Sequence, residues 1–474
     1  MNRNLYFLGN LFLGLTVAAG LLQSIINLQI GGQIYFLDSF TGWFIGVNII
    51  SLAVSLILLK YYHYKKYWFV FSTLTIAAVA SFCLFIIMYR ILEARQLAGY
   101  YTPVFLLSLG TGAVYAISLI FSKAGKRTWL KTAGVFTFVI NLILMSVVIW
   151  HTNSQDVELK DTLEKMSQWI SMAGNLVPML FILNFLGEVK LLNTENVNTT
   201  EQKFSGNLLT VAGLSALGFT FGFGLQLAAE SSSSVYWGKR IFEQTQDIAK
   251  LFEARTFVSS KGDTLLYRLL KPLDYDPQKK YPMVLSLPYG GQPGTDKIRQ
   301  IEGAAAAQLL SSDMNRRKYP AFLFIPNCPA GAGWGGIPNY PTVDSLVFDA
   351  INVLQKQEPG IDVKRCYVTG ISRGGYGAWH FISIRPDMFA AAIPVCGGGD
   401  PKLAPNIVDV SIWAFHGAKD RNVPVSGSRD MIAAIKKAGG NPRYTEFPDA
   451  HHNIWEDVKN TPGLLDWLFA QKRD

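Results

Sequence analysis

The residues with the clearest chemical potential lie in the segment CYVTGISRGGYGAWH, residues 366–380. A β-rich run ends near Thr369, and Gly370-Ile371-Ser372-Arg373-Gly374 leads into a helical pattern. A GxSxG sequence between a strand and a helix predicts a tight turn that lifts the serine hydroxyl clear of the sheet. The amide of the next residue, Arg373, then faces the place where an oxyanion would form. This context favours Ser372 as a nucleophile; the alternative is a tight loop in which the serine caps the helix.

A serine nucleophile needs a base, and the base needs an orienting carboxylate. The histidines after Ser372 are His380, His416, His451 and His452. We expect His380 to point away from the turn and His416, at the end of the run SIWAFHG, to pack beneath the following loop. The other two follow the run RYTEFP, and only one of them can be the base because adjacent side chains point in different directions.

The carboxylate is expected between the serine and the histidine in chain order. Asp420, in the sequence HGAKD, follows the strand that ends at His416 and is the favoured candidate. Asp400 follows the preceding strand and is the fallback. Asp449 lies too close to the histidines in sequence to be preferred.

A second oxyanion donor is expected from the loop LPYGGQPG, residues 287–294, after an earlier strand. Pro288 has no N–H group, so the amide of Tyr289 or Gly290 must donate. A further loop, CPAGAGWGGIPNYP at 328–341, should lie at the carboxyl end of its strand, where open α/β sheets bind substrates. Trp334 and Tyr340 could wall the substrate pocket there, with simple loop packing as the alternative.

The elements that position these residues alternate between short β-rich runs and helical patterns from residue 251 onward. This alternation predicts a mostly parallel sheet with helices on both faces. The runs ARTFV and TLLYRLL are separated by a short turn at 261–263 and should form an antiparallel hairpin at one edge. The helical patterns lie at about 297–311, 343–357, 374–385, 425–438 and 461–471.

The first half of the chain has a different composition. Residues 1–230 contain 14 Lys/Arg and 10 Asp/Glu, against 29 and 24 in the remainder. Seven apolar stretches, near the ~20 residues that a spanning helix needs, lie at about 5–27, 43–59, 67–89, 102–122, 129–150, 168–187 and 207–229. Such a series cannot share one water-soluble core, so we expect an all-α transmembrane bundle of about seven helices.

The loop charges predict the orientation of this bundle. With the N-terminus inside, the inside segments carry ten Lys/Arg and the outside loops four, as the positive-inside rule requires. Seven crossings then place the C-terminal half on the outer, periplasmic side of the cytoplasmic (inner) membrane. The predicted organisation is a transmembrane domain at 1–230, an interfacial linker at 231–250 and a catalytic domain at 251–474.

Other partners find little support in the sequence. The net charge of +9 is spread over both halves without a dense basic stripe, which argues against a nucleic-acid partner. The four cysteines form no CxxC pair and no Cys/His ligand spacing, so neither a metal nor a cofactor is expected. The expected partners are the lipid bilayer and an ester substrate, either a small molecule or borne on a polymer.

Taken together, residues 252–471 resemble the compact α/β-hydrolase esterases described as prolyl-oligopeptidase-like or phospholipase/carboxylesterase-like, related to feruloyl esterases. The resemblance rests on VTGISRGGYGAWHF, PDMFAAAIPVCGGGD, WAFHGAKDRNVPV and RYTEFPDAHHNIWED. It implies an α/β-hydrolase fold with Ser372 as nucleophile, Asp420 as acid and His452, which Asn453 follows in step, as base. It does not extend to the membrane half.

One departure from the family pattern concerns the oxyanion loop, where the usual Leu-His-Gly reads Leu287-Pro288-Tyr289. The predicted function is a membrane-anchored serine hydrolase that cleaves carboxylic esters through an acyl-enzyme intermediate. A serine peptidase of the prolyl-oligopeptidase-like type is the alternative enzyme. A weak or inactive hydrolase fold that serves as a binding or sensor domain, and a transporter bundle with an accessory hydrolase, are alternatives of other classes.

Overall fold

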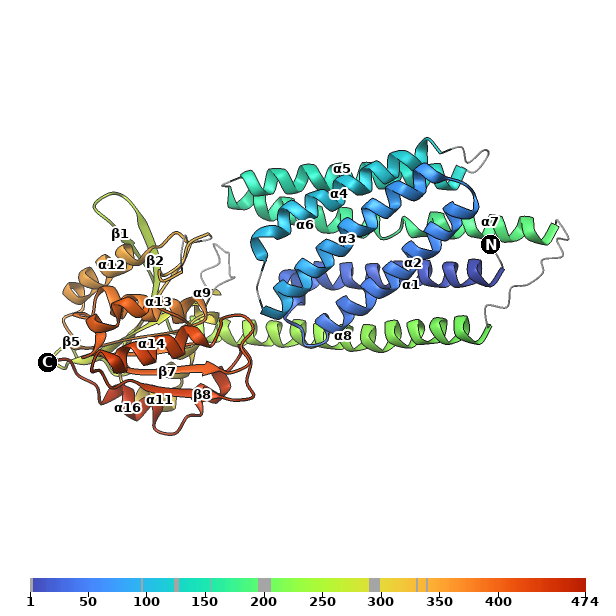
Figure 1. The fold of residues 1–474 in the computed structure, drawn as a ribbon. Helices are drawn as coiled ribbons and strands as arrows, with labels where there is room; N and C mark the ends of the chain where they lie inside the picture. Colours follow the sequence, from blue (N-terminus) through green and yellow to red (C-terminus); the bar gives the residue numbers. More distant parts are fainter. Residues whose placement is uncertain are drawn as a thin grey trace. The chain divides into compact units, whose positions relative to one another are not determined.

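The chain divides into two contiguous units, Met1–Trp237 and Gly238–Asp474. The computed structural model describes residues 3–94, 97–122, 128–154, 156–194, 206–289, 299–329, 331–337 and 340–474. Helices make up the first unit, whereas the second unit is built around a sheet (Figure 1). The two units are described separately.

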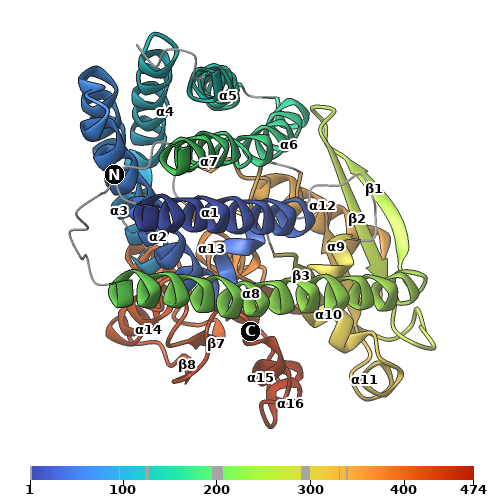
Figure 2. The ribbon, with the colours of Figure 1, turned by 90° about the vertical axis from the view of Figure 1, so that its right-hand side faces the viewer.

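The helices of the first unit are long and apolar, and in the described residues they supply seven candidate membrane spans. They are α1 (Arg3–Ile30), η1 (Gly31–Phe36), α2 (Phe40–Tyr64), α3 (Trp68–Ala94), α4 (Ala98–Ile120), α5 (Thr128–Asn153), α6 (Val157–Gly174), α7 (Pro178–Thr194) and α8 (Gly206–Ala249). Helix α1 packs against α2, α6 and α7, while α4 lies between α3 and α5 (Figure 2). The predicted all-α region with seven spans is confirmed.

The sixth predicted span, at 168–187, is interrupted. Helix α6 ends at Gly174 and α7 begins at Pro178, because proline cannot donate the hydrogen bond that would continue the helix. Asn175 in the break donates to the carbonyl of Gly20 (2.9 Å) and to the hydroxyl of Ser24 (3.0 Å), so this turn is bonded to α1.

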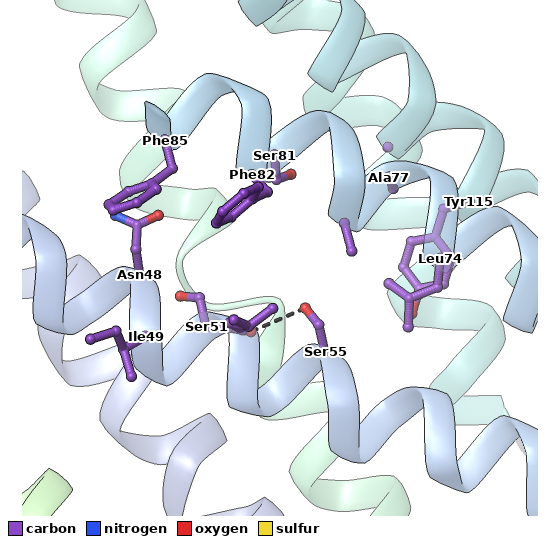
Figure 3. Close-up of a pocket in the computed structure, with 13 residues that line it drawn as sticks. Asn48, Ile49, Ser51, Ser55, Leu74, Ala77, Ser81, Phe82, Phe85 and Tyr115 are labelled. Carbon is purple, nitrogen blue, oxygen red and sulfur yellow. Dashed lines mark hydrogen bonds between the residues drawn. The ribbon is translucent and has the colours of Figure 1, made fainter. Parts of the chain in front are cut away.

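A cavity of about 330 Å³ lies between α2, α3 and α4 of this unit. Phenyl rings and small side chains line it, together with the hydroxyls of Ser51, Ser55 and Ser81 (Figure 3). The Ser55 hydroxyl donates to the carbonyl of Ser51 (3.0 Å). This hydroxyl therefore has an acceptor within its own helix and needs no ligand.

The last helix of the first unit continues through the predicted interfacial linker. Helix α8 has no break between Gly206 and Ala249, so residues 231–249 are helical. Tyr236 and Trp237 in this segment are both exposed. The domain boundaries at 230 and 250 stay predictions.

The second unit contains an eight-stranded sheet in the order β1-β2-β4-β3-β5-β6-β7-β8. The strands are β1 (Glu253–Val258), β2 (Thr264–Leu270), β3 (Tyr281–Leu287), β4 (Phe322–Pro326), β5 (Ile361–Ile371), β6 (Ala391–Val395), β7 (Ser411–Gly417) and β8 (Arg443–Phe447). The predicted edge hairpin is confirmed, because β1 pairs with β2 antiparallel. Strand β2 is also antiparallel to β4, and the pairs from β4 to β8 are parallel.

Helices cover both faces of this sheet (Figure 1). One apolar cluster joins the sheet to α12 (Asp344–Gln357), α13 (Arg373–Ile384), η2 (Pro401–Ile407) and α14 (Ser426–Lys437). A second cluster joins the opposite face to α9 (Arg299–Glu302), α10 (Ala305–Leu310), α15 (Trp455–Lys459) and α16 (Leu464–Phe469). The short helix α11 (Asp313–Lys318) precedes β4. The predicted α/β-hydrolase architecture is confirmed.

One predicted helix is divided in the structure and another is shorter. The pattern at 297–311 becomes α9 and α10 with Gly303 between them, and that at 461–471 contains the shorter helix α16. The break in the first has a structural reason, since the carbonyl of Gly303 accepts a hydrogen bond from the amide of Tyr289 (3.0 Å). The break thus anchors the loop that follows β3.

Candidate active site

Ser372 occupies the single residue between strand β5 and helix α13. Its backbone angles are φ 57° and ψ −116°, a conformation that costs a non-glycine residue about 1–3 kcal/mol. The Ser372 amide donates to the carbonyl of Val395 at the end of β6 (2.9 Å), which holds this conformation in place. The strand–turn–helix context predicted for Ser372 is confirmed.

The tightness of the turn explains its glycines. A Cβ atom added at Gly370 would lie 2.4 Å from the backbone of Gly374, so no larger residue fits there. Within the described residues, the Ser372 hydroxyl makes no capping hydrogen bond to α13. This observation disfavours the alternative in which the serine serves only as a helix cap.

Asp420 and His452 meet at the carboxyl edge of the sheet. Nδ1 of His452 lies 2.7 Å from Oδ2 of Asp420. The Asp420 side chain is completely buried, whereas that of His452 is 22% exposed. A buried carboxylate beneath a partly exposed imidazole can orient that ring while its other nitrogen remains accessible to a reacting group.

The Asp420 carboxylate is fixed by several donors. Its Oδ1 accepts the amides of Asn422 (2.7 Å) and Val423 (2.9 Å). Burial by itself would raise the pKa of Asp420, but hydrogen bonds from His416 and His452 outweigh it and hold that pKa well below its ordinary value. Asp420 is therefore ionised throughout the neutral range.

The competing candidates lie elsewhere. His451 is exposed, with its Nδ1 2.9 Å from the carbonyl of Lys419. Asp449 forms an exposed ion pair with the Lys419 ammonium (2.7 Å). The fallback Asp400 caps η2 by accepting the amide of Lys402 (3.0 Å).

Strand β6 connects Ser372 to His452. Val395, the last residue of β6, accepts the amide of Ser372. The next residue, Cys396, donates its thiol to the carbonyl of His452 (3.4 Å). Segments that are 80 residues apart in sequence are thus attached to consecutive residues of one strand end.

The oxyanion loop departs from the prediction. The Tyr289 amide is already bonded to the Gly303 carbonyl (3.0 Å), so in this structure it is not free to donate to an oxyanion, and that part of the prediction does not hold. Gly290, the other candidate, lies outside the described residues. Arg373 is the first residue of α13, and its amide has no acceptor within the helix.

The two aromatic residues proposed as pocket walls have different environments. Trp334 is completely buried, and its indole N–H donates to the carbonyl of Pro288 (2.8 Å), so it supports the oxyanion loop from within. Tyr340 is 37% exposed, and the Arg373 guanidinium lies 5.3 Å from its ring centroid. The same guanidinium donates to the carbonyl of Ala332 (3.0 Å) and connects this loop to the start of α13.

One group of side chains has the composition of a metal site. Ligand atoms of Cys396, His416 and Asp420 lie within 4.8 Å of one another, and all three residues are buried. Burial together with Asp420 raises the pKa of the Cys396 thiol well above its ordinary value, and this thiol donates to the carbonyl of His452 (3.4 Å). Asp420 is also already bonded to His452.

From the sequence, we expected His416 only to pack beneath the following loop. His416 is indeed completely buried beneath the loop after β7. Its Nε2, however, also lies 3.3 Å from Oδ2 of Asp420. The four-residue spacing between the two in HGAKD was the available signal.

A comparison with protein families agrees with this architecture. Residues 339–462 match the family model described as "Dienelactone hydrolase family". The C-terminal unit is a hydrolase domain. The match includes Ser372, Asp420 and His452, and the roles of these residues are proposals developed below.

Two curated relatives each match part of this chain. "Uncharacterized peptidase YuxL" of Bacillus subtilis is 25% identical over 225 residues, 39% of this chain and 33% of that protein. An "Uncharacterized secreted protein" of Arthroderma benhamiae is 23% identical over 284 residues, 50% of this chain and 30% of that protein. This chain therefore spans about a third of the length of these curated relatives.

Solved structures similar to this chain include a "Thermostable Esterase", with 36% identity and a TM-score of 0.45, covering 48% of this chain and 64% of that chain. A "ferulic acid esterase" is 16% identical with a TM-score of 0.36, covering 46% and 96%. An acylaminoacyl peptidase of Pyrococcus horikoshii is 18% identical with a TM-score of 0.38, covering 47% and 42%.

Proposed function

We propose that this chain is a membrane-anchored serine hydrolase that cleaves carboxylic esters. The observation that carries the proposal is the contact between the buried Asp420 and His452 (2.7 Å) at the sheet edge that also holds the strained Ser372. A strained serine followed by a helix, together with a carboxylate-oriented imidazole, is the arrangement that acyl-transfer chemistry requires.

In the proposed mechanism, the Ser372 hydroxyl attacks the ester carbonyl while Nε2 of His452 takes its proton. His452 then passes that proton to the leaving alcohol, and a covalent acyl-enzyme remains. Water, deprotonated by the same imidazole, attacks the acyl group, and the imidazolium returns this proton to the Ser372 oxygen as the acid is released. Asp420 keeps the Nδ1–H tautomer of His452 and stabilises the imidazolium that forms in each half-reaction.

The oxyanion would be bound by the amide of Arg373, with Gly290 as the proposed second donor. Tyr340, which is exposed next to the Arg373 side chain, is proposed to contact the substrate. Trp334 is proposed to act on the substrate only indirectly, because its bond to Pro288 positions the loop that carries Gly290.

The helical unit is proposed to anchor the hydrolase domain in the cytoplasmic membrane. Its seven candidate spans indicate a multi-pass membrane protein. The excess of Lys/Arg in alternate loops supports an inside N-terminus and a hydrolase domain on the outer, periplasmic side. An outer location would give the domain access to esters that do not enter the cell.

Peptide hydrolysis is a second candidate, since one curated relative is described as a peptidase. The same Ser372 would attack an amide carbonyl, and His452 would have to protonate a poorer leaving group. Rates on a p-nitrophenyl ester and on a peptide p-nitroanilide separate the two: the ester proposal predicts hydrolysis of the ester alone.

The test is labelling of cells with a membrane-impermeant fluorophosphonate, after permeabilisation of any outer membrane. We expect the wild type to be labelled and Ser372→Ala to remain unlabelled. Labelling only after lysis would overturn the proposed orientation while keeping the enzyme. Folded wild-type protein that is unlabelled even in lysed membranes would contradict a serine hydrolase and favour a binding or sensor domain.

A further inference from the structure

A second imidazole contacts the carboxylate of the proposed triad. His416 ends strand β7, and its side chain is completely buried. Its Nε2 lies 3.3 Å from Oδ2 of Asp420, the same oxygen that is 2.7 Å from Nδ1 of His452. The same Nε2 lies 3.1 Å from the carbonyl of Val423.

The neighbours of His416 determine where its ring hydrogens lie. Both groups next to Nε2, the Asp420 carboxylate and the Val423 carbonyl, are acceptors, so Nε2 must carry a hydrogen. On the other side, Nδ1 is 2.8 Å from the Ser428 hydroxyl, which is itself 3.1 Å from the carbonyl of Gly397.

The single hydroxyl hydrogen of Ser428 allows two arrangements. It can be donated to Gly397, in which case Nδ1 of His416 is also protonated and the ring is a cation. It can instead be donated to Nδ1, in which case the ring is neutral. Both arrangements keep a hydrogen on Nε2 of His416, which is 3.1 Å from the Val423 carbonyl and 3.3 Å from Oδ2 of Asp420.

We propose that His416 is a positioning residue of the triad, which holds Asp420 Oδ2 in place through its Nε2–H group and shares the carboxylate charge with His452. This inference rests on the proposed function and adds a residue to it. His416 touches no reacting atom and acts only through Asp420.

The surroundings of His416 support this assignment. Burial alone would raise the pKa of Asp420, whereas the hydrogen bonds from His416 and His452 lower it. Among the described residues, two other titratable groups face His416. The Cys396 thiol lies within the same 4.8 Å group, and Glu446 is the register partner of His416 on β8. Glu446 is bonded to Arg429 (2.5 Å) and Tyr444 (2.7 Å), which leaves Asp420 as the carboxylate on His416.

The two imidazoles compete for one oxygen, and this predicts a pH effect. Without His416, more of the negative charge on Oδ2 would be available to His452. His452 would then hold its proton to higher pH, and because it must be neutral to act as base, the acid limb of kcat/KM would move upward. A residue that only fills space would not move this limb.

The test uses the full-length chain in detergent with a p-nitrophenyl ester. For His416→Met, which removes the donor at similar volume, we expect kcat to fall roughly 10- to 100-fold, the usual worth of a hydrogen bond to a charged group. The acid limb should move upward by about one pH unit. His416→Gln keeps an N–H donor at the position of Nε2 and should restore most of both.

A matched control is available in a third carboxylate-paired histidine, which lies apart from the proposed triad. Nε2 of His380 lies 2.6 Å from Oδ2 of Asp344, and no contact of His380 with Asp420 or His452 is found in the described residues. His380→Gln should therefore keep the wild-type pH profile. An upward shift of its acid limb equal to that of His416→Met would overturn the proposal, because the effect would not be specific to Asp420.

Other results would also contradict the proposed role of His416. A folded His416→Met with an unshifted acid limb, or equal losses in the Met and Gln variants, would reduce His416 to packing and overturn the proposal. If His416→Met does not fold, His416→Gln is compared with His416→Asn, whose side chain is too short to reach Asp420. Equal pH profiles of these two variants would overturn the proposal. An inactive wild type would instead overturn the proposed function, whereas an active wild type with insensitive variants would refute this inference alone.

Discussion

The two units of this chain differ in how several of their polar side chains are bonded. In the helical unit, hydroxyls such as those of Thr16, Ser55 and Ser146 donate to the carbonyl four residues back in the same helix. In the hydrolase domain, polar groups connect distant elements: Asp420 bonds to His452 and His416 bonds to Ser428. A locally bonded hydroxyl fixes nothing beyond its own helix, whereas a cross-element bond fixes the relative position of two segments.

The helical unit has exceptions that sharpen this contrast. Glu188 on α7 is buried and accepts from Tyr61 (2.8 Å) and Lys65 (2.8 Å) of the α2 region. These groups pair with one another in the helical unit, as charges in an apolar environment must. In the hydrolase domain the polar network instead ends at a partly exposed imidazole, where a substrate can reach it.

The largest effect should separate two serines. Ser372→Ala removes the proposed nucleophile and should lower kcat/KM by about 10⁶-fold, as for other serine triads. Ser55→Ala removes a hydroxyl bonded within its own helix and should change activity by less than about 2-fold. Steady-state hydrolysis of a p-nitrophenyl ester by the purified full-length variants measures both. Similar activities in the two variants would contradict the proposed nucleophile.

The next effect should separate two aspartates of the same domain. Asp420→Asn places an amide where two imidazole N–H groups need an acceptor, so His452 loses its productive tautomer and kcat should fall on the order of 10⁴-fold. Asp449→Asn breaks only an exposed ion pair with Lys419 and should stay within about 2-fold of wild type. The assay is again ester hydrolysis, and a larger loss in the Asp449 variant would assign the acid to that residue.

A smaller effect concerns two glycines. A Cβ atom at Gly397 would lie 2.3 Å from the backbone of Gly375, so Gly397→Ala should lower the free energy of unfolding of the hydrolase domain by about 1–3 kcal/mol. At Gly218 in α8, an added Cβ would meet no described atom within 4 Å, so Gly218→Ala should be neutral or stabilising by up to about 1 kcal/mol. Calorimetry of the full-length variants would show which unfolding transition moves. An unchanged transition in Gly397→Ala would contradict the close approach of Gly397 to the backbone of Gly375.

The smallest effect should depend on pH. Glu358 is bonded to Arg255 (2.8 Å) and Lys271 (2.9 Å). Burial would raise the pKa of Glu358, but its bonds to Lys271 and Arg255 lower it overall. A carboxylate whose pKa is lowered in the folded state stabilises the fold at pH values above its ordinary pKa of about 4.3. This stabilisation is lost as the pH falls through the folded-state pKa.

Glu358→Gln should therefore lower the free energy of unfolding by about 1–2 kcal/mol at pH 7. The difference from wild type should shrink as the pH falls below about 4. Glu243→Gln, in an exposed pair with Lys239 on α8, should change it by less than about 0.5 kcal/mol. Denaturant titration at several pH values measures these differences. A difference for Glu358→Gln that persists unchanged at low pH would exclude the ion pairs as its cause.

Local patterns predicted the elements of the fold well where short-range physics dominates. The edge hairpin, the helix α12 and the strand–turn–helix at Ser372 follow from turn residues and apolar periodicity within each segment. The segment 297–311 was predicted as one helix and is two, because the bond between Tyr289 and Gly303 interrupts it. No pattern inside that segment indicates a partner 14 residues earlier.

Residue patterns predicted the two classes of structure in this chain, the turn that carries Ser372 and a small set of acids and histidines that could act with it. Which of these side chains contact one another follows from the tertiary structure. His452 rather than His451 meets Asp420, and the Tyr289 amide is already bonded. His416, which we expected only to pack beneath the following loop, also contacts the Asp420 carboxylate. The reason is the sequence separation of the interacting residues. A turn is fixed by neighbouring residues, whereas the hydrogen-bond partners at the site depend on the alignment of strands that are far apart in the chain.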